Sequence, residues 1–156
     1  GLQVECGADN ENWLWSAIAT VANASADAAK AAVRKVRVAK EVSLVTRAKA
    51  VFDQAKWKPQ TKLDHNYLGV SGKIHTFDLA VMSGEKTALI DAVTPHHNSI
   101  AAKYLAFSDT ASHSGIYKYA LYEGDLSSED KSLLSNVADL IPYKSLVGTD
   151  GSFVLQ

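Results

Sequence analysis

The sequence predicts an α/β (α+β) fold in which a central mixed sheet is flanked by helices. Residues 63–95 contain three apolar runs separated by two turns, Ser71-Gly72 and Ser83-Gly84, a pattern typical of a three-stranded antiparallel meander. A helical segment and a fourth apolar strand follow. The third and fourth strands are therefore joined by a crossover, which makes them parallel.

Length and composition favour one ordinary domain over residues 1–156, with N-terminal helices in 10–57 and a sheet core in 63–122. The chain is 47% hydrophobic and 21% charged, so it can bury a core. It has no apolar run near the roughly 20 residues that span a bilayer and no recognisable signal peptide, so we expect no membrane association. Cys6 is the single cysteine, which excludes an internal disulfide and fits a cytoplasmic protein.

Helical spacing dominates the first third of the chain. A first helix is expected from about Asn10, with Trp13 and Trp15 on different faces and both as core anchors. A second helix is expected from Ser25, with a break or short strand between Val33 and Val38. Helical periodicity then returns and ends by Trp57 or Lys58, ahead of Pro59.

The predicted second and third strands each contain an aspartate, Asp78 in FDLAV and Asp91 in LIDAV. Desolvating a carboxylate costs several kcal/mol unless it is paired or binds a metal. The two residues could face one point on neighbouring strands. Asp91 lies among larger apolar neighbours, so we expect its pKa to be the more strongly raised of the two unless a cation compensates.

After the meander, Ser99 is predicted to cap a helix that extends to Phe107 and carries Lys103. Residues 116–122 are expected to form the fourth strand. A last amphipathic helix is expected after a turn and cap at residues 125–128, and it ends before Pro142. A short strand pair is expected around Asp150-Gly151. The apolar face of that helix consists of Leu133, Leu134, Val137 and Leu140.

Charge is unevenly distributed along the chain. Residues 30–62 contain ten basic and two acidic side chains, a net charge of +8, whereas residues 109–139 carry a net charge of −4. A basic segment beside a carboxylate site is what a protein that binds a phosphate backbone needs, although a solvated helix face gives the same pattern. The candidate nucleic-acid contacts are Arg34, Lys35, Arg37, Lys40 and Arg47.

Two strand carboxylates and one from a preceding helix can hold a hard cation such as Mg²⁺. This order of parts, with Glu41, Asp78 and Asp91 as the matching acids, resembles the PD-(D/E)XK restriction-endonuclease-like superfamily over about residues 38–122. The segment GVSGKIHTFDLAV also looks like an uncharacterised bacterial domain family. The resemblance implies a Mg²⁺-dependent nuclease of a phage or bacterial conflict system, with Asp78 and Asp91 as metal ligands and Glu41 orienting the metal or its water. Glu41 has a simpler interpretation as an i,i+4 salt bridge with Arg37.

One departure from that pattern bears on activity. The superfamily's late motif is an acid, any residue and a lysine, but here it is Asp91-Ala92-Val93. Some members of the superfamily move the lysine to the following helix, and Lys103 lies in that element. The resemblance therefore implies either an active nuclease with Lys103 near the phosphate, or a degenerate scaffold.

Two other interpretations remain open. Asp91, His96, His97 and His113 could form a transition-metal site. Alternatively, the protein is a noncatalytic binding protein that uses exposed aromatic residues against a protein partner or nucleic acid. The aromatic candidates are Trp13, Trp15, Tyr117, Tyr119 and Tyr122. Nucleophilic catalysis has little support, because no G-x-S-x-G motif is present.

Overall fold

The computed structural model describes residues 3, 5, 11–111 and 115–155, so Cys6 and His113 lie outside the described residues. The chain forms two compact units, residues 1–39 and 40–156. The predicted sheet core, residues 63–122, lies within the second unit. The elements in chain order are α1 (Glu11–Gln54), β1 (Gln60–Leu68), β2 (Ile74–Ser83), β3 (Lys86–Val93), α2 (His97–Asp109), β4 (Ile116–Tyr122), α3 (Ser128–Ser135), β5 (Asp139–Pro142), α4 (Tyr143–Gly148) and the 3₁₀ helix η1 (Ser152–Leu155).

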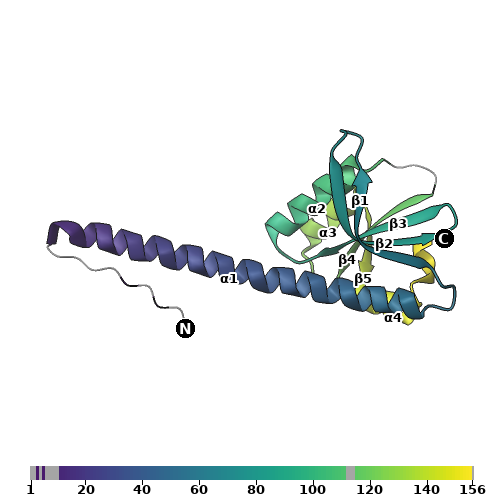
Figure 1. Cartoon of the computed structure of the whole chain (residues 1–156), viewed down its shortest axis with the longest axis horizontal. Coiled ribbons are helices and arrows are strands. Elements are labelled where there is room, and N and C mark those ends of the chain that lie inside the picture. The colour runs from purple at the N-terminus through teal and green to yellow at the C-terminus, as the bar shows by residue number, and fades with distance from the viewer. Residues whose placement is uncertain (1–2, 4, 6–10, 112–114, 156) are drawn as a thin grey trace. The chain divides into compact units, whose positions relative to one another are not determined.

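The predicted mixed sheet is confirmed, with the strand order β1-β2-β3-β4-β5 (Figure 1). Strands β1, β2 and β3 form the antiparallel meander, and β3 pairs with β4 in parallel through the crossover that contains α2. Strand β5 adds a second parallel pair, which the sequence analysis did not predict. The turns that join the meander use Gly72 and Gly84 at positive φ, a conformation that glycine adopts at little cost.

Helices cover both faces of this sheet. On one face, Leu44, Ala48 and Phe52 from the C-terminal part of α1 pack against Val81, Ile90 and other strand residues. On the other face, Phe107 of α2 and Leu134 of α3 pack against Leu89 and its neighbours. Strand residues therefore alternate between two apolar layers, as the period of a β-strand requires.

The predicted break between Val33 and Val38 is wrong, because α1 runs unbroken from Glu11 to Gln54. Alternation of valine with basic residues suggested a strand there. Valine in a helix costs only a few tenths of a kcal/mol, and the neighbouring alanines favour the helix. The prediction that Trp13 and Trp15 anchor a core is also wrong, because their side chains are 62% and 77% exposed.

The C-terminal region also differs from the prediction. Helix α3 ends at Ser135, and Leu140 lies in β5 rather than in the helix. The expected strand pair around Asp150-Gly151 is instead a turn between α4 and η1, with both residues at positive φ. A Cβ on Gly151 would lie 2.3 Å from the Phe52 ring, so tertiary packing against α1 determines this turn.

Among the described residues, no helix has both the length and the apolar character needed to cross a membrane.

Candidate functional site

Asp78 and Asp91 lie where strands β2 and β3 stop pairing through their backbones. The register between these strands runs from Ser83↔Lys86 to Leu79↔Ile90. Beyond this register, backbone N–H groups donate to aspartate side chains of the opposite strand. The Asp78 N–H donates to Oδ1 of Asp91 (2.9 Å), and the Ala92 N–H donates to Oδ2 of Asp78 (2.8 Å). Each carboxylate is therefore held by the opposite strand, which fixes both at one place on the sheet.

Helix α2 supplies the cation that faces these two acids. The Lys103 ammonium lies 3.0 Å from Oδ2 of Asp78 and 3.0 Å from Oδ1 of Asp91. The exposed fractions of the side chains are 29% for Asp78, 17% for Lys103 and 1% for Asp91. The cluster thus extends from a fully buried acid to one that solvent can reach.

Burial raises the pKa of Asp91 to about 7, because attraction to Lys103 offsets only part of the cost of desolvating the charged carboxylate. Burial acts in the opposite direction on the lysine, but its attraction to Asp91 and Asp78 outweighs that effect and raises the pKa of Lys103. The expectation that Asp91 is strongly perturbed is confirmed. Perturbed groups of this kind gather at functional sites, although structural ion pairs produce them as well.

One observation indicates that these residues can bind a hard divalent cation. Oδ2 of Asp91 is buried and has no hydrogen-bond partner, so it retains an unused ligand position. Among the described residues, no group of three or more His, Cys, Asp or Glu side chains is placed to hold a metal. A cation here would have two carboxylates, and Mg²⁺ is commonly held by one or two carboxylates together with waters and substrate phosphates.

Val93 occupies the position at which the superfamily pattern has its lysine. Its side chain is buried in the apolar layer beneath α2, so no charge from that position reaches the acids. Lys86, the first residue of β3, donates to the carbonyl oxygen of Leu155 at 2.8 Å. Lys103 is the lysine that the structure brings to both aspartates, and its predicted place near a phosphate stays a prediction.

Glu41 is joined to the same helix by a different contact. Its Oε1 accepts hydrogen bonds from the hydroxyls of Thr94 and Ser99, both at 2.8 Å. Ser99 lies four residues before Lys103, so the two side chains share one face of α2. Glu41 therefore ties α1 to the end of β3 and to the first turn of the helix that carries the lysine. Within the described part of the chain, the hydrogen bonds of Glu41 go to Thr94 and Ser99 and not to Asp78, Asp91 or Lys103.

Ser99 was predicted to cap α2, but the structure places the N-cap at His96, whose side chain accepts from the Asn98 N–H at 3.2 Å. The Ser99 hydroxyl is thereby left for Glu41. The alternative site of Asp91 with His96, His97 and His113 gains no support in the described residues, and His113 lies outside them.

The basic candidates fall in both units. Arg34, Lys35 and Arg37 belong to the first unit, whereas Lys40 and Arg47 belong to the second. Arg47 donates to both carboxylate oxygens of Glu123, at 2.8 and 2.6 Å, and its guanidinium lies 4.5 Å from the centre of the Tyr143 ring. Its charge is already matched within the fold, so it is a weaker candidate for a phosphate contact than the sequence suggested. The side chains of Arg34, Lys35 and Lys40 are exposed.

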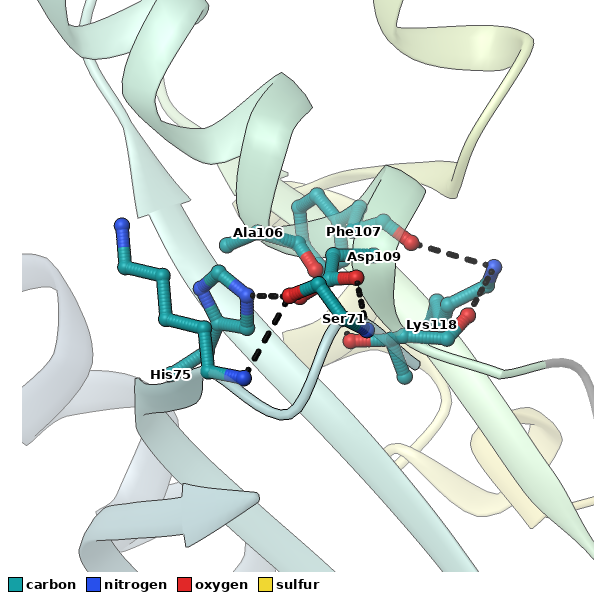
Figure 2. A network of polar contacts seen from close by, with 8 residues as sticks. Ser71, His75, Ala106, Phe107, Asp109 and Lys118 are labelled. Atoms are coloured by element: carbon teal, nitrogen blue, oxygen red, sulfur yellow. Dashed lines mark hydrogen bonds and ion pairs between the residues drawn. The ribbon is translucent and has the colours of Figure 1, made fainter. Parts of the chain in front are cut away.

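A second carboxylate cluster, which the sequence analysis missed, joins the β1–β2 turn to the C-terminal end of α2 (Figure 2). Oδ2 of Asp109 accepts from the Ser71 hydroxyl at 2.6 Å and lies 2.6 Å from Nε2 of His75. Oδ1 accepts from the Ser71 N–H at 2.8 Å. The hydrogen bonds from Ser71 and His75 lower the pKa of Asp109 to about 2, so this carboxylate is ionised.

These three residue types also form the catalytic triad of serine hydrolases, but their order of contact differs. In a triad the serine donates to the histidine, which acts as the base. Here Ser71 and His75 both meet Asp109, so the serine has no base beside it. Lys118 donates to the carbonyl oxygens of Phe107 and Thr110 at the same end of α2, both at 3.3 Å. The cluster therefore closes a helix end and a turn, and we assign it a structural role.

No protein family model matches the chain, and no curated protein matches it either. Two solved structures are similar to it, each with 14% sequence identity. The first is a protein of unknown function, AF1548, with a TM-score of 0.49 over 67% of this chain and 58% of that one. The second is protein VC1899 from Vibrio cholerae, with a TM-score of 0.45 over 72% of this chain and 30% of that one. The match thus spans less than two thirds of either neighbour, and neither adds to the functional argument.

Proposed function

We propose that this protein is a metal-dependent phosphodiesterase that acts on nucleic acid. The observation that carries the proposal is the convergence of two strand aspartates and a helix lysine, with one aspartate oxygen buried and unpartnered. A buried acid and its neighbour held toward one point need a compensating cation, and a metal bound to a phosphate provides one.

In this proposal each residue of the cluster has a distinct role. Asp78 and Asp91 hold Mg²⁺, which when bound supplies charge neutralisation at the phosphate and an activated water. Lys103 binds a phosphate oxygen and stabilises the charge that develops there. Glu41 positions α2 through Ser99, so it acts on the lysine rather than on the substrate.

The exposed basic residues favour a negatively charged substrate. Lys40, Arg34 and Lys35 are exposed in a segment of net charge +8, and such a segment attracts a phosphate backbone in a salt-dependent manner. A metal-dependent nuclease of this kind fits a cytoplasmic component of a phage or bacterial conflict system, which is the setting that we propose.

Cleavage of plasmid DNA and of a labelled RNA, each with Mg²⁺ or Mn²⁺, tests the proposal. We expect cleavage by the wild-type protein and a loss of at least a hundredfold in Asp78→Ala. The matched control is Asp139→Ala, which removes an exposed acid from β5, and we expect it to keep the wild-type rate. Intact substrates with every divalent metal would count against the proposal.

A second candidate is a noncatalytic binding protein on the same scaffold. It is favoured by the exposed Trp13 and Trp15 and by the ion pairs through which Lys103 already compensates the two acids. Calorimetry separates the two functions. No binding of Mg²⁺ or Mn²⁺ to a folded protein that still binds DNA would favour this second candidate.

A further inference from the structure

Lys103 occupies the position that a cation shared by the two aspartates would take. Its ammonium lies 3.0 Å from an oxygen of each acid, so it already supplies positive charge where a metal ion held by the same two carboxylates would supply it. A lysine ammonium is a compact point charge that repels a divalent ion at such short range. The lysine and a metal ion therefore compete for the same pair of carboxylates.

The Lys103 side chain can move its ammonium away from the two aspartates. This side chain is 17% exposed and carries the ammonium on a flexible four-carbon stem, and Asp78, which it contacts, is 29% exposed. A nucleic-acid phosphate brought to that open side would offer the ammonium a new anionic partner. A phosphate that attracts Lys103 away from the acids would leave both carboxylates free for the metal.

We propose that Lys103 is a built-in counter-ion that couples metal binding to phosphate binding, so that the metal binds tightly only when a phosphodiester has drawn the lysine away. This inference rests on the proposed function, since it concerns the same site. It goes beyond that function by making the order and the strength of metal and substrate binding a property of one side chain. By thermodynamic linkage, the metal must strengthen phosphate binding by the same factor as the phosphate strengthens metal binding.

The first test measures Mn²⁺ binding without substrate, by the loss of the free-ion electron paramagnetic resonance signal. We expect Lys103→Gln to bind Mn²⁺ at least tenfold more tightly than the wild-type protein does. The control is Lys49→Gln, which removes the same charge from an exposed pair with Asp53 and should leave the affinity unchanged. Equal affinities in the wild type and in Lys103→Gln would overturn the inference while leaving the proposed function standing. Absence of Mn²⁺ binding in both folded proteins would overturn the proposed function as well.

The second test needs no variant and so does not depend on whether Lys103→Gln folds. The ¹⁵N signals of lysine ammonium groups are followed in the wild-type protein while Mg²⁺ is added. We expect the Lys103 signal to be visible at first, because its hydrogens are held by two carboxylates, and then to be lost or shifted as Mg²⁺ binds. An unchanged Lys103 signal at saturating Mg²⁺ would overturn the inference.

The third test measures the coupling directly, with a fluorescent 12-base-pair DNA duplex as the probe. We expect Ca²⁺ to strengthen duplex binding at least fivefold in the wild-type protein, within the usual range of coupling between sites. The gain should shrink to less than twofold in Lys103→Gln and should persist in Lys49→Gln. The same gain in all three proteins would mean that the lysine does not mediate the coupling.

Discussion

Helix α2 is joined to strand β2 by two carboxylate clusters that differ in almost every physical respect. Asp91 is 1% exposed, has an oxygen without a partner, and has a raised pKa. Asp109 is 20% exposed, accepts hydrogen bonds at both oxygens, and has a lowered pKa. A structural link is expected to satisfy all its polar atoms, as the Asp109 cluster does. The Asp91 cluster retains unused binding capacity at a cost in stability, and this difference distinguishes the candidate site from the structural cluster.

The largest expected effect is a pH dependence of stability that Asp91 confers. Its pKa is about 7 in the folded protein against an ordinary value of 3.8. Between these values the folded protein holds a proton that the unfolded chain has released, so the free energy of unfolding decreases as the pH rises from about 4 to 7. The loss is about 4 kcal/mol at most, since one pKa unit corresponds to about 1.4 kcal/mol. Urea denaturation with EDTA at a series of pH values measures it.

Asp91→Asn should remove this slope, because asparagine does not titrate, while Asp139→Asn should keep it. Parallel profiles for the wild type and Asp91→Asn between pH 4 and 7 would show that the buried acid is not the source. The contrast between the two carboxylate clusters would then lose its main support.

The next effect comes from removing the cation of the buried cluster. Lys103→Met should lower the free energy of unfolding by about 3 kcal/mol at pH 8, because it leaves the buried charge of Asp91 without a compensating cation. The cost should be smaller at pH 5, where Asp91 holds a proton and has no charge to compensate. Lys49→Met, which breaks an exposed pair, should change stability by less than about 1 kcal/mol. A cost for Lys103→Met that is the same at both pH values would contradict this account.

Local sequence patterns were enough to predict strands β2 and β3 and helix α2, which carry the candidate site. The turn at Ser83-Gly84 fixes the β2–β3 register, and that register brings Asp78 and Asp91 to neighbouring positions on the sheet. The helix after β3 then had to pack on one face of the sheet, which brought Lys103 within reach of both acids. Glycine turns, strand alternation and helical spacing are local signals, so a single sequence carries them.

The features that escaped prediction depend on partners far along the chain. Ser71 and Asp109 are 38 residues apart, and nothing in either local sequence indicates that they meet. The sequence Asp150-Gly151 is typical of a β-hairpin turn and equally of a turn between two helices. Packing of Gly151 against Phe52 favours the turn between helices. Ser99 resembles a helix cap by residue type, but its hydroxyl instead donates a hydrogen bond to a carboxylate 58 residues away, that of Glu41.

A smaller effect is expected from crowding the Asp109 cluster. A Cβ at Gly69 would lie 2.1 Å from Oδ2 of Asp109 and 3.1 Å from its backbone oxygen, so Gly69→Ala must displace that carboxylate. We expect a loss of about 1–2 kcal/mol in the free energy of unfolding, typical of overpacking. Gly148→Ala is the control, because a Cβ there has no neighbour within 4 Å, and it should be neutral or slightly stabilising. Equal stability of the two variants would mean that the β1–β2 turn is not held by Asp109.

The smallest effect should be the acid response of Asp109 itself, and its sign should be opposite to that of Asp91. A lowered pKa means that the folded protein releases a proton that the unfolded chain still holds. The stability that Asp109 contributes is therefore fully present above pH 4 and is lost as the pH falls toward its folded pKa of about 2. Asp109→Asn should flatten the stability profile below pH 4 and leave the slope between pH 4 and 7 unchanged. Because the two windows do not overlap, one pH series on the wild type, Asp91→Asn and Asp109→Asn separates the clusters. A change in the upper window caused by Asp109→Asn would show that the two carboxylates act as one network through α2.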